Sequence, residues 1–464
     1  MNVFVEVGYL LATVSFLGGL KFMSSPKHAK TGNLIAATGM IIAVLCTFWM
    51  LTTQTVPSIN LIIIAVAILL GSIGGKIMAS KVEMTAMPQL VSLFNATGGG
   101  CAMLLGIVEA KQASLDSSFL GMQILLFLGL ITGAVAASGS IIAYRKLAGK
   151  TRDNRNSMVV LGSRTLLLSF ILIPVLYFIG IIPLPFEIIA YVMAFIALVY
   201  GVLFVLPIGG ADMPVVISLL NSITGIATAL AGFVYGNKAM IAGGIFVGAA
   251  GILLTLLMCR AMNRSLLKVL AGKFKKGKVA EDAGEQNIKE TTVSETAMQL
   301  SFANKIAIIP GYGLAVAQGQ HLCGQLQQLL EKRDAQVDFI IHPVAGRMPG
   351  HMNVLLAEAN IDYEHLKEMD LVNGDMAYYD MVLIIGANDV VNPAAENNPE
   401  SPIYGMPIIK AYQSKQTVVM KRGMSKGYAG VTNDLFGMDN CNLLFGDAKD
   451  SLQNILNISL HKKV

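Results

Sequence analysis

Long apolar runs alternate with short polar connections over the first half of the chain. About nine of these runs come close to the roughly 20 residues that cross a bilayer as a helix. They cover Val3–Leu20, Leu34–Leu51, Ile59–Met78, Met87–Val108, Phe119–Ala143, Met158–Gly180, Phe186–Val205, Met213–Tyr235 and Met240–Met262. The pattern predicts a polytopic α-helical membrane domain over residues 1–264, with its sixth run the least regular because Arg164 lies within it.

The pattern changes after Met262. A charged stretch, "GKFKKGKVAEDAGEQNIKETTVSETA", predicts a linker over residues 265–299. From 300 to 464, β-rich runs alternate with helical ones. The predicted strands are "KIAIIPGYG", "VDFIIHP", "DMVLIIGAND", "TVVMKR" and "NLLFGDA", and the predicted helices are "LAVAQGQHLCGQLQQLLEKR" and "NVLLAEAN". Strand and helix in alternation predict a soluble α/β domain, Rossmann-like, with a parallel sheet.

Composition and charge agree with a membrane protein. The chain of 464 residues is 54% hydrophobic and only 14% charged. The connections "KFMSSPKHAKTGN", "GKIMASKVE" and "YRKLAGKTRDNRN" are basic, whereas the alternate ones carry almost no Lys or Arg. Basic loops mark the cytoplasmic side, so the N-terminus is expected outside and the C-terminal domain in the cytoplasm. The first run contains Glu6 and follows no basic segment, which favours a retained helix over a signal peptide.

Two function classes receive no support from the composition. The net charge of +5 comes largely from the cytoplasmic loops, and no nucleic-acid partner is needed to explain it. The five cysteines are scattered, without a CxxC pair or a metal-type spacing. We therefore expect no metal site.

A glycine turn follows the first predicted strand of the soluble domain. In "PGYGLAVAQ", Gly311, Tyr312 and Gly313 form a GxG, while Val316 and Ala317 stand where a dinucleotide fingerprint has its third glycine. In such a fingerprint one glycine makes the tight turn and another lets the backbone approach pyrophosphate. The turn indicates a nucleotide site, although an ordinary glycine turn would look the same.

The second predicted strand bears on which nucleotide would bind. An NAD site has an acidic residue there for the ribose hydroxyls, but this strand ends in His342. A 2′-phosphate needs cationic donors instead, and Lys421 and Arg422 follow a later strand. NADP is therefore favoured over NAD. The alternative for the basic pair is a solvated strand end.

Two further residues lie in loops after predicted strands. Arg347 is a candidate for a phosphate contact, and Asp389 follows the strand "DMVLIIGAND" at the edge where open α/β sheets bind ligands. Asp389 could equally cap Val390 or Val391 in a turn. The loop histidines His342 and His351 could be ligands, but isolated histidines in loops are more often structural.

One segment of the membrane domain occurs twice. "MPQLVSLFNATGG" begins at Met87 and "MPVVISLLNSITG" at Met213, with the same spacing from proline to asparagine. An amide in a membrane helix is costly unless paired, so Asn95 and Asn221 should face the bundle interior or a wet cavity. Glu83 and Asp212 precede the two helices and could exchange protons there. The alternatives are interhelical hydrogen bonding for the amides and interfacial charges for the acids.

Taken together, these stretches resemble the β subunit of the proton-translocating NAD(P) transhydrogenases over essentially the whole chain. The stretches are "IGGADMPVVISLLNS", "CRAMNRS", "PGYGLAVAQ", "IHPVAGRMPGHMNVLLAEA", "LIIGANDVVNPAA", "GMPI", "KRGMSKGYAG" and "LFGDAK". The resemblance implies hydride transfer between NAD(H) and NADP(H) coupled to proton movement across the cell inner membrane. It also implies an α subunit that supplies the NAD(H)-binding domain and further membrane helices, in a dimer of αβ units.

The resemblance assigns residues to the NADP(H) site. It implies that Lys421, Arg422 and Tyr428 grip the 2′-phosphate, that Arg347 meets the phosphates, and that Asp389 links nucleotide state to proton transfer. The remaining nucleotide contacts that it implies lie in "GYGLAVAQ", "GAND" and "LFGDAK", and include Gly386, Ala387, Asn388, Gly446 and Asp447.

Two features concern the proton path. We expect "CRAMNRSLLKVLAGK", with Arg260, Arg264 and Ser265, to continue the last membrane helix and carry the coupling signal. Some relatives have a membrane histidine at the position of Asn95 and acidic residues at those of Ala86 and Gln89. Either the titrating group lies on a partner helix, which we favour, or water ordered by Asn95 and Asn221 forms the path.

A different class of function fits part of the same pattern. A membrane transporter or channel could be gated by a cytosolic NADP(H)-binding domain that senses redox state. Its repeated helices would start on the same side, which excludes an inverted repeat. Such a sensor binds NADP(H) without turnover, whereas a transhydrogenase exchanges hydride once its NAD(H)-binding partner is present.

Overall fold

The computed structural model describes residues 3–25, 28–53, 56–115, 120–151, 154, 156–263, 265–270, 288–348, 350–427 and 429–461. The chain divides into two compact units, Met1–Thr255 and Leu256–Val464. The functional boundaries expected from the sequence, at residues 264 and 299, stay predictions.

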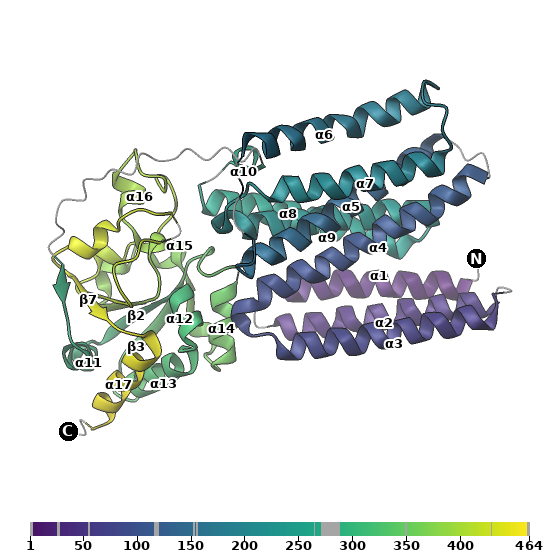
Figure 1. Cartoon of the computed structure of the whole chain (residues 1–464). Helices are drawn as coiled ribbons and strands as arrows, with labels where there is room; N and C mark the ends of the chain where they lie inside the picture. Colours follow the sequence, from purple (N-terminus) through teal and green to yellow (C-terminus); the bar gives the residue numbers. More distant parts are fainter. Residues whose placement is uncertain are drawn as a thin grey trace. The chain divides into compact units, whose positions relative to one another are not determined.

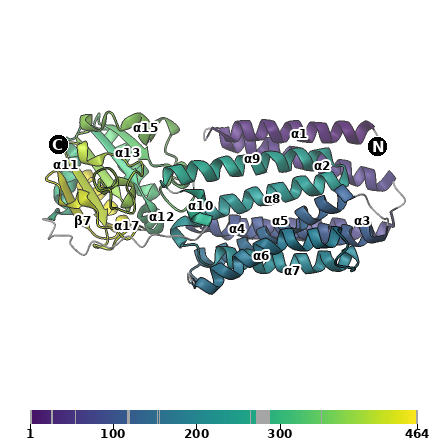
Figure 2. The ribbon, with the colours of Figure 1, turned by 90° about the horizontal axis from the view of Figure 1, so that it is seen from above.

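The first unit is built from long apolar helices. In the described part of the chain, nine helices are long and apolar enough to cross a membrane. They are α1 (Val3–Met23), α2 (Ala29–Thr53), α3 (Ser58–Lys81), α4 (Met87–Leu115), α5 (Leu120–Leu147), α6 (Ser157–Phe178), α7 (Phe186–Val205), α8 (Met213–Tyr235) and α9 (Lys238–Ala261). Figures 1 and 2 show that these helices run side by side along the unit. Each overlaps one apolar run, so the predicted membrane domain is confirmed, including the sixth helix with Arg164.

Small residues let these helices pack closely. A Cβ on Gly99 of α4 would lie 2.7 Å from the backbone nitrogen of Ala137 on α5. A Cβ on Gly225 of α8 would lie 2.5 Å from the backbone nitrogen of Gly248 on α9. Contact of this kind between backbones is a main source of helix association in lipid. Among the nine helices, α5 has the largest buried share, and it contacts α4, α7 and α8.

The second unit contains a seven-stranded parallel sheet in the order β1-β7-β6-β5-β2-β3-β4. Its strands are β1 (Lys289–Glu290), β2 (Lys305–Pro310), β3 (Gln336–Ile341), β4 (Leu366–Glu368), β5 (Met381–Ile385), β6 (Thr417–Lys421) and β7 (Cys441–Phe445). The five strands expected from the sequence are β2, β3, β5, β6 and β7. The predicted Rossmann-like parallel sheet is therefore confirmed.

Helices and turns cover this sheet. The helices are α11 (Val293–Phe302), α12 (Tyr312–Ala317), α13 (Gln320–Glu331), α14 (His351–Glu358), α15 (Met369–Val372), α16 (Ala394–Asn397) and α17 (Ala448–His461). Alternate strand residues such as Ile309, Ile384 and Val419 join one buried core with residues of α15. Residues between them point to the other face, where α13 contacts β3 and α17 contacts β6. Both faces of the sheet are thus covered, as parallel sheets require.

Two expected helices are interrupted in the structure. The stretch "LAVAQGQHLCGQLQQLLEKR" forms α12 and α13 rather than one helix, because Gln318 adopts a left-handed conformation with φ of 54°. The continuation of the last membrane helix is also wrong as predicted. Helix α9 ends at Ala261, Asn263 has φ of 47°, and a separate short helix, α10, spans Leu266–Leu270.

Three elements of the second unit lie within the stretch expected to be a linker. They are α10, β1 and most of α11, which begins at Val293. A sequence signal for this helix was present in the capping box at its start: Thr292 accepts from the Glu295 N–H, and the Glu295 carboxylate accepts from the Thr292 N–H.

Candidate functional site

The loops that follow the parallel strands gather at one edge of the sheet, which we call the carboxyl edge. Strand β2 lies between β3 and β5, so the chain leaves this strand toward one side and later returns on the other. Open α/β sheets bind ligands at such a topological switch point. The candidate nucleotide residues come from loops after β2, β3, β5, β6 and β7, as predicted from the pattern of strands.

The glycine turn after β2 presses directly against the loop after β5. The Gly313 N–H donates to the Gly386 carbonyl at 3.0 Å, and the Gly311 N–H donates to the Ile385 carbonyl at 2.8 Å. A Cβ on Gly311 would lie 2.4 Å from the Ala387 nitrogen, and one on Gly313 would lie 2.6 Å from the Gly386 Cα. Gly386 itself has φ of 68°. Only glycine allows the two backbones to approach so closely.

The short helix α12 explains the missing third glycine. Its N-cap is Gly311, and it ends at Ala317 before the left-handed Gln318. A fingerprint's third glycine serves close packing of helix against strand. Val316, at that position, is 41% exposed, and Ala317 is half-buried. The departure from the fingerprint is thus compatible with the fold.

Arg347 extends from the loop after β3 to the turn after β2. Its guanidinium lies over the Tyr312 ring, with 4.5 Å from Cζ to the ring centroid. Its backbone N–H donates to Nδ1 of the buried His351 at 3.1 Å. Burial, followed by the charge of Arg347, lowers the pKa of His351, so a neutral ring supports this loop. The backbone of Gly346, with φ of 100°, packs against the His351 ring.

Asp389 connects the loops after β5 and β6. Its Oδ2 accepts from the Ala429 N–H at 2.9 Å. A Cβ on Gly427 would lie 2.2 Å from Oδ1 of the same carboxylate, so the glycine permits the contact. Asp389 also begins a short 3-10 turn that ends at Val391. The carboxylate therefore holds the segment predicted to fold over the nucleotide, 40 residues away along the chain.

Two asparagines, Asn392 and Asn433, form further hydrogen bonds between the loops after β5 and β6. Their role was not predicted from the sequence. Asn433 Nδ2 donates to both the carbonyl and the Oδ1 of Asn388, each at 3.0 Å. The fully buried Asn392 donates to the Thr432 carbonyl and accepts from the Asp434 N–H. The available signal was the run of short polar residues after a buried strand, a composition typical of loops that bond to backbone.

The basic pair after β6 lies at the carboxyl edge. The Lys421 ammonium is 4.1 Å from the centroid of the Phe436 ring, and burial lowers the pKa of Lys421. Arg422 is exposed. Tyr428 lies outside the described residues. Both cations thus come from the strand end next to the Gly386–Asp389 loop, where the Gly386 N–H donates to the Met420 carbonyl.

The last predicted contacts follow β7. The Gly446 N–H donates to the Lys421 carbonyl at 3.1 Å, which places this loop beside the basic pair. Asp447 Oδ1 accepts from the Lys449 N–H at 2.9 Å, an N-terminal cap for α17. Asp447 therefore has a structural role that needs no ligand.

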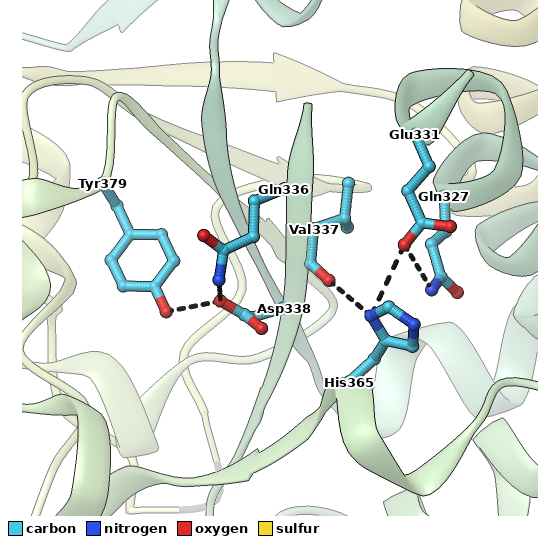
Figure 3. Close-up of polar contacts among 7 residues, drawn as sticks. All are labelled: Gln327, Glu331, Gln336, Val337, Asp338, His365 and Tyr379. Atoms are coloured by element: carbon cyan, nitrogen blue, oxygen red, sulfur yellow. Dashed lines mark hydrogen bonds and ion pairs between the residues drawn. The ribbon is translucent and has the colours of Figure 1, made fainter. Parts of the chain in front are cut away.

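No carboxylate stands at the described end of β3. The strand ends at Ile341, and the next residue of the chain is His342. Its Nε2–H donates to the Pro407 carbonyl, and its Nδ1 accepts from the Val344 N–H. Asp338 lies in the middle of the strand. Figure 3 shows that the Tyr379 hydroxyl and the Gln336 amide both donate to it, at 2.9 and 3.1 Å. Gln336 begins β3 and Tyr379 precedes β5, so this carboxylate is held toward the opposite edge.

The repeated membrane helices α4 and α8 are neighbours, but their asparagines differ. A Cβ on Gly98 of α4 would lie 3.2 Å from a methyl carbon of Thr224 on α8. Asn95 is 7% exposed and donates to Ser140 of α5 at 2.8 Å. Asn221 is exposed on this chain. Asn95 therefore faces the interior of the bundle, whereas the expectation that Asn221 faces the bundle interior or a wet cavity stays a prediction.

The charged residues proposed for coupling also have different surroundings. Glu83 is exposed before α4, whereas Asp212 is 2% exposed at the N-cap of α8. Arg260 is exposed in the last turn of α9. Arg264 lies outside the described residues.

Comparison with known proteins agrees with both halves of this description. A sequence profile of the NAD(P) transhydrogenase beta subunit matches residues 5–458. A protein named NAD(P) transhydrogenase subunit beta from Rhodospirillum rubrum is 40% identical over 458 residues, which cover 97% of each chain. A second sequence of that name and organism matches to the same extent. The chain belongs to the NAD(P) transhydrogenase beta-subunit family.

Membership in the transhydrogenase beta-subunit family gives the two units a common context. The chain is a multi-pass membrane protein and a transhydrogenase subunit, which implies an oxidoreductase role and an α partner. The carboxyl edge, with its glycine turn and basic strand end, is then a candidate site for a nicotinamide nucleotide.

Proposed function

We propose that this chain binds NADP(H) at the carboxyl edge and couples hydride transfer from NADH, held by an α subunit, to proton translocation. The observation that carries the proposal is the seam between the loops after β5 and β6. Asp389 holds the backbone of Ala429, within the segment that directly follows Lys421 and Arg422. Because the Asp389 carboxylate contacts this loop, a change in the conformation of the nucleotide-binding loop can be linked to a change in the charge of the carboxylate.

Preference for NADP(H) over NAD(H) follows from the donors at this edge. The described end of β3 offers His342 and no carboxylate for a ribose hydroxyl, whereas Lys421 and Arg422 offer a point charge and a forked donor for a phosphomonoester. Arg347, stacked on Tyr312, is positioned by its backbone to reach a pyrophosphate at the glycine turn.

Binding of the two nucleotides to the full chain tests this proposal. Calorimetry should give strong preference for NADP⁺ over NAD⁺, and Lys421→Ala/Arg422→Ala should abolish the preference. The matched control is Lys332→Ala/Arg333→Ala, another adjacent Lys–Arg pair, located between α13 and β3 at the opposite edge. Equal binding of both nucleotides by the unmodified chain would refute the NADP(H) assignment.

The reaction needs a second nucleotide site, because hydride must pass between two nicotinamides held in contact. We assign NAD(H) to the α subunit, in a dimer of αβ units. Hydride exchange by the reconstituted αβ complex separates this proposal from a redox-sensing transporter, which would bind NADP(H) without turnover.

Proton movement supplies the direction of the reaction. One proton moving down about 200 mV releases about 4.6 kcal/mol, at about 2.3 kcal/mol per 100 mV. That energy biases the nucleotide ratio roughly a thousandfold toward NADPH, at about 1.4 kcal/mol per tenfold. Coupling requires that nucleotide affinity change with protonation.

The proposed proton path runs along α4 and α8. Asn95 is buried within the bundle, while Asn221 is exposed on this chain, which supports a partner helix against α8 that carries the titrating group. We propose that Arg264, between α9 and α10, transmits the signal. Replacing Arg264 should uncouple the two activities, and full proton pumping in that variant would refute the idea.

The proposed orientation places the N-terminus outside the inner membrane and the C-terminal domain in the cytoplasm. It is supported by the basic loops between α1 and α2, between α3 and α4, and between α5 and α6, and by the basic segment after α9. Protease accessibility of the C-terminal domain in inside-out vesicles tests it. Protection of that domain in such vesicles would overturn the orientation.

A further inference from the structure

A buried lysine lies at the end of α5, outside the sites described above. Lys146 is 9% exposed, and its ammonium donates to the Leu206 carbonyl at 2.6 Å and to the Ile208 carbonyl at 2.7 Å. Leu206 is the C-cap of α7, where a cation is favoured by the helix dipole and by the unpaired carbonyls.

The segment that Lys146 holds leads directly into the second repeated helix. Ile208 is fully buried, and four residues later Asp212 forms the N-cap of α8 at 2% exposure. The fixed position of the Leu206–Ile208 backbone therefore limits where the Asp212 carboxylate can lie. Asp212 is the acid proposed for proton exchange at this end of the bundle.

The first repeated helix is tied to the same end of α5. The Gln89 amide, two residues after the start of α4, donates to the Leu147 carbonyl at 3.2 Å. An ionised glutamate could not donate there, so Gln89 has a bonding role of its own. The last two residues of α5 thus bond to the start of α4 and to the segment that leads into α8, and Figures 1 and 2 show α4, α5 and α8 side by side.

Capping of α7 alone does not require a charged residue. A neutral amide could donate to the same carbonyls, whereas a buried ammonium carries a large desolvation cost. The charge is therefore the feature to explain. Its location beside the segment that carries Asp212 suggests that it acts on the proton path.

We propose that Lys146 is a positioning residue of the proton path. It holds the Leu206–Ile208 segment in place and supplies a positive charge, so that Asp212 stays at the entrance of α8 in the form that exchanges protons with the nucleotide side. This inference rests on the proposed function, because it presumes that protons enter between α4 and α8.

The test uses the αβ complex in proteoliposomes. Hydride transfer from NADH to NADP⁺ and proton movement are measured together from pH 6 to pH 9 for Lys146→Met, Lys146→Arg and a control, Lys150→Met. Lys150 is exposed four residues later, so its replacement removes the same charge at the same helix end. We expect at least a tenfold loss of coupled transfer and a shifted pH profile in Lys146→Met, substantial recovery in Lys146→Arg, and wild-type behaviour in Lys150→Met.

A double-mutant cycle shows whether Lys146 acts through Asp212. The effects of Lys146→Met and Asp212→Asn should not add if the two share one role, whereas independent roles give additive effects. Additive losses, or a wild-type pH profile in Lys146→Met, would overturn the proposal. If Lys146→Met does not accumulate in the membrane, Lys146→Gln keeps an N–H donor without the charge and takes its place.

Failure of this proposal can be told from failure of the proposed function. If the unmodified αβ complex transfers no hydride or moves no protons, the proposed function is wrong. If the unmodified complex is coupled and Lys146→Met remains equally coupled, only the role of Lys146 is wrong. Unchanged NADP⁺ affinity in Lys146→Met shows that the nucleotide domain is intact.

Discussion

Replacement of Gly427 is the sharpest test of the contact between the loop after β5 and the loop after β6. Replacing it with alanine would place a Cβ 2.2 Å from Oδ1, 2.6 Å from Cγ and 2.7 Å from Oδ2 of Asp389. These distances lie well inside van der Waals contact, so either the carboxylate or the loop must move by about 1 Å. The Asp389–Ala429 hydrogen bond, 2.9 Å long, would be lost in either case.

The size of the effect follows from that bond. A hydrogen bond to a charged group contributes about 1.5–3 kcal/mol. If binding of NADP⁺ requires the anchored loop, the apparent affinity falls with the population of that state. At about 1.4 kcal/mol per tenfold, Gly427→Ala should weaken NADP⁺ binding by about 10-fold to about 150-fold.

Calorimetry on the full chain measures this effect. The matched control is Gly423→Ala in the same loop, where an added Cβ meets nothing within 4 Å. In an Asp389→Ala background the clash is removed, so Gly427→Ala should add little further loss. Wild-type affinity in Gly427→Ala, an equal loss in Gly423→Ala, or fully additive losses with Asp389→Ala would each refute the reasoning.

Three further predictions concern stability and coupling. Gly311→Ala should lower the unfolding temperature of the second unit by several degrees in calorimetry, because its Cβ would lie 2.4 Å from backbone atoms. The control Gly374→Ala, whose Cβ would meet nothing within 4 Å, should leave that temperature unchanged. Equal shifts in the two variants would contradict this prediction. Burial lowers the pKa of both His342 and His351 below the ordinary value near 6.5, so the stability of the second unit should be complete above about pH 6.5 and be lost as pH falls toward the folded-state values. Replacing either histidine with Gln should flatten this dependence, and an unchanged slope in thermal melts would count against it. Asn95→Leu should reduce proton translocation at least tenfold in proteoliposomes without changing NADP⁺ affinity, and full coupling would remove Asn95 from the path.

Much of the architecture could be predicted because its signals are local. Each membrane helix corresponds to an apolar run, since a span must bury its own backbone within a stretch of about 20 residues. Each of the five predicted strands is a short apolar run bounded by polar or glycine-rich segments. The carboxyl ends of parallel strands lie at the same edge of a sheet. The glycines and cations that follow the predicted strands therefore located the candidate nucleotide site at the carboxyl edge.

The errors arose where one backbone torsion decided the outcome. Gln318 and Asn263 adopt positive φ and interrupt helices that their sequences would allow to continue. The two repeated asparagines differ for another reason: their segments copy each other, yet Asn95 is buried and donates to Ser140 of α5, whereas Asn221 is exposed on this chain. Identical local patterns cannot show which face a neighbouring helix covers.

The sequence by itself determined the membrane spans, the parallel sheet and the kinds of residue at the carboxyl edge, because hydropathy period and turn chemistry act over a few residues. Only the tertiary structure decided that Asp389 holds Ala429, 40 residues away, and that Lys146 holds Leu206 and Ile208, about 60 residues away. Such pairs depend on how whole elements pack. Contacts between distant segments leave no periodic trace in a single chain, so the residues that couple one loop or helix to another appear only when the elements are assembled.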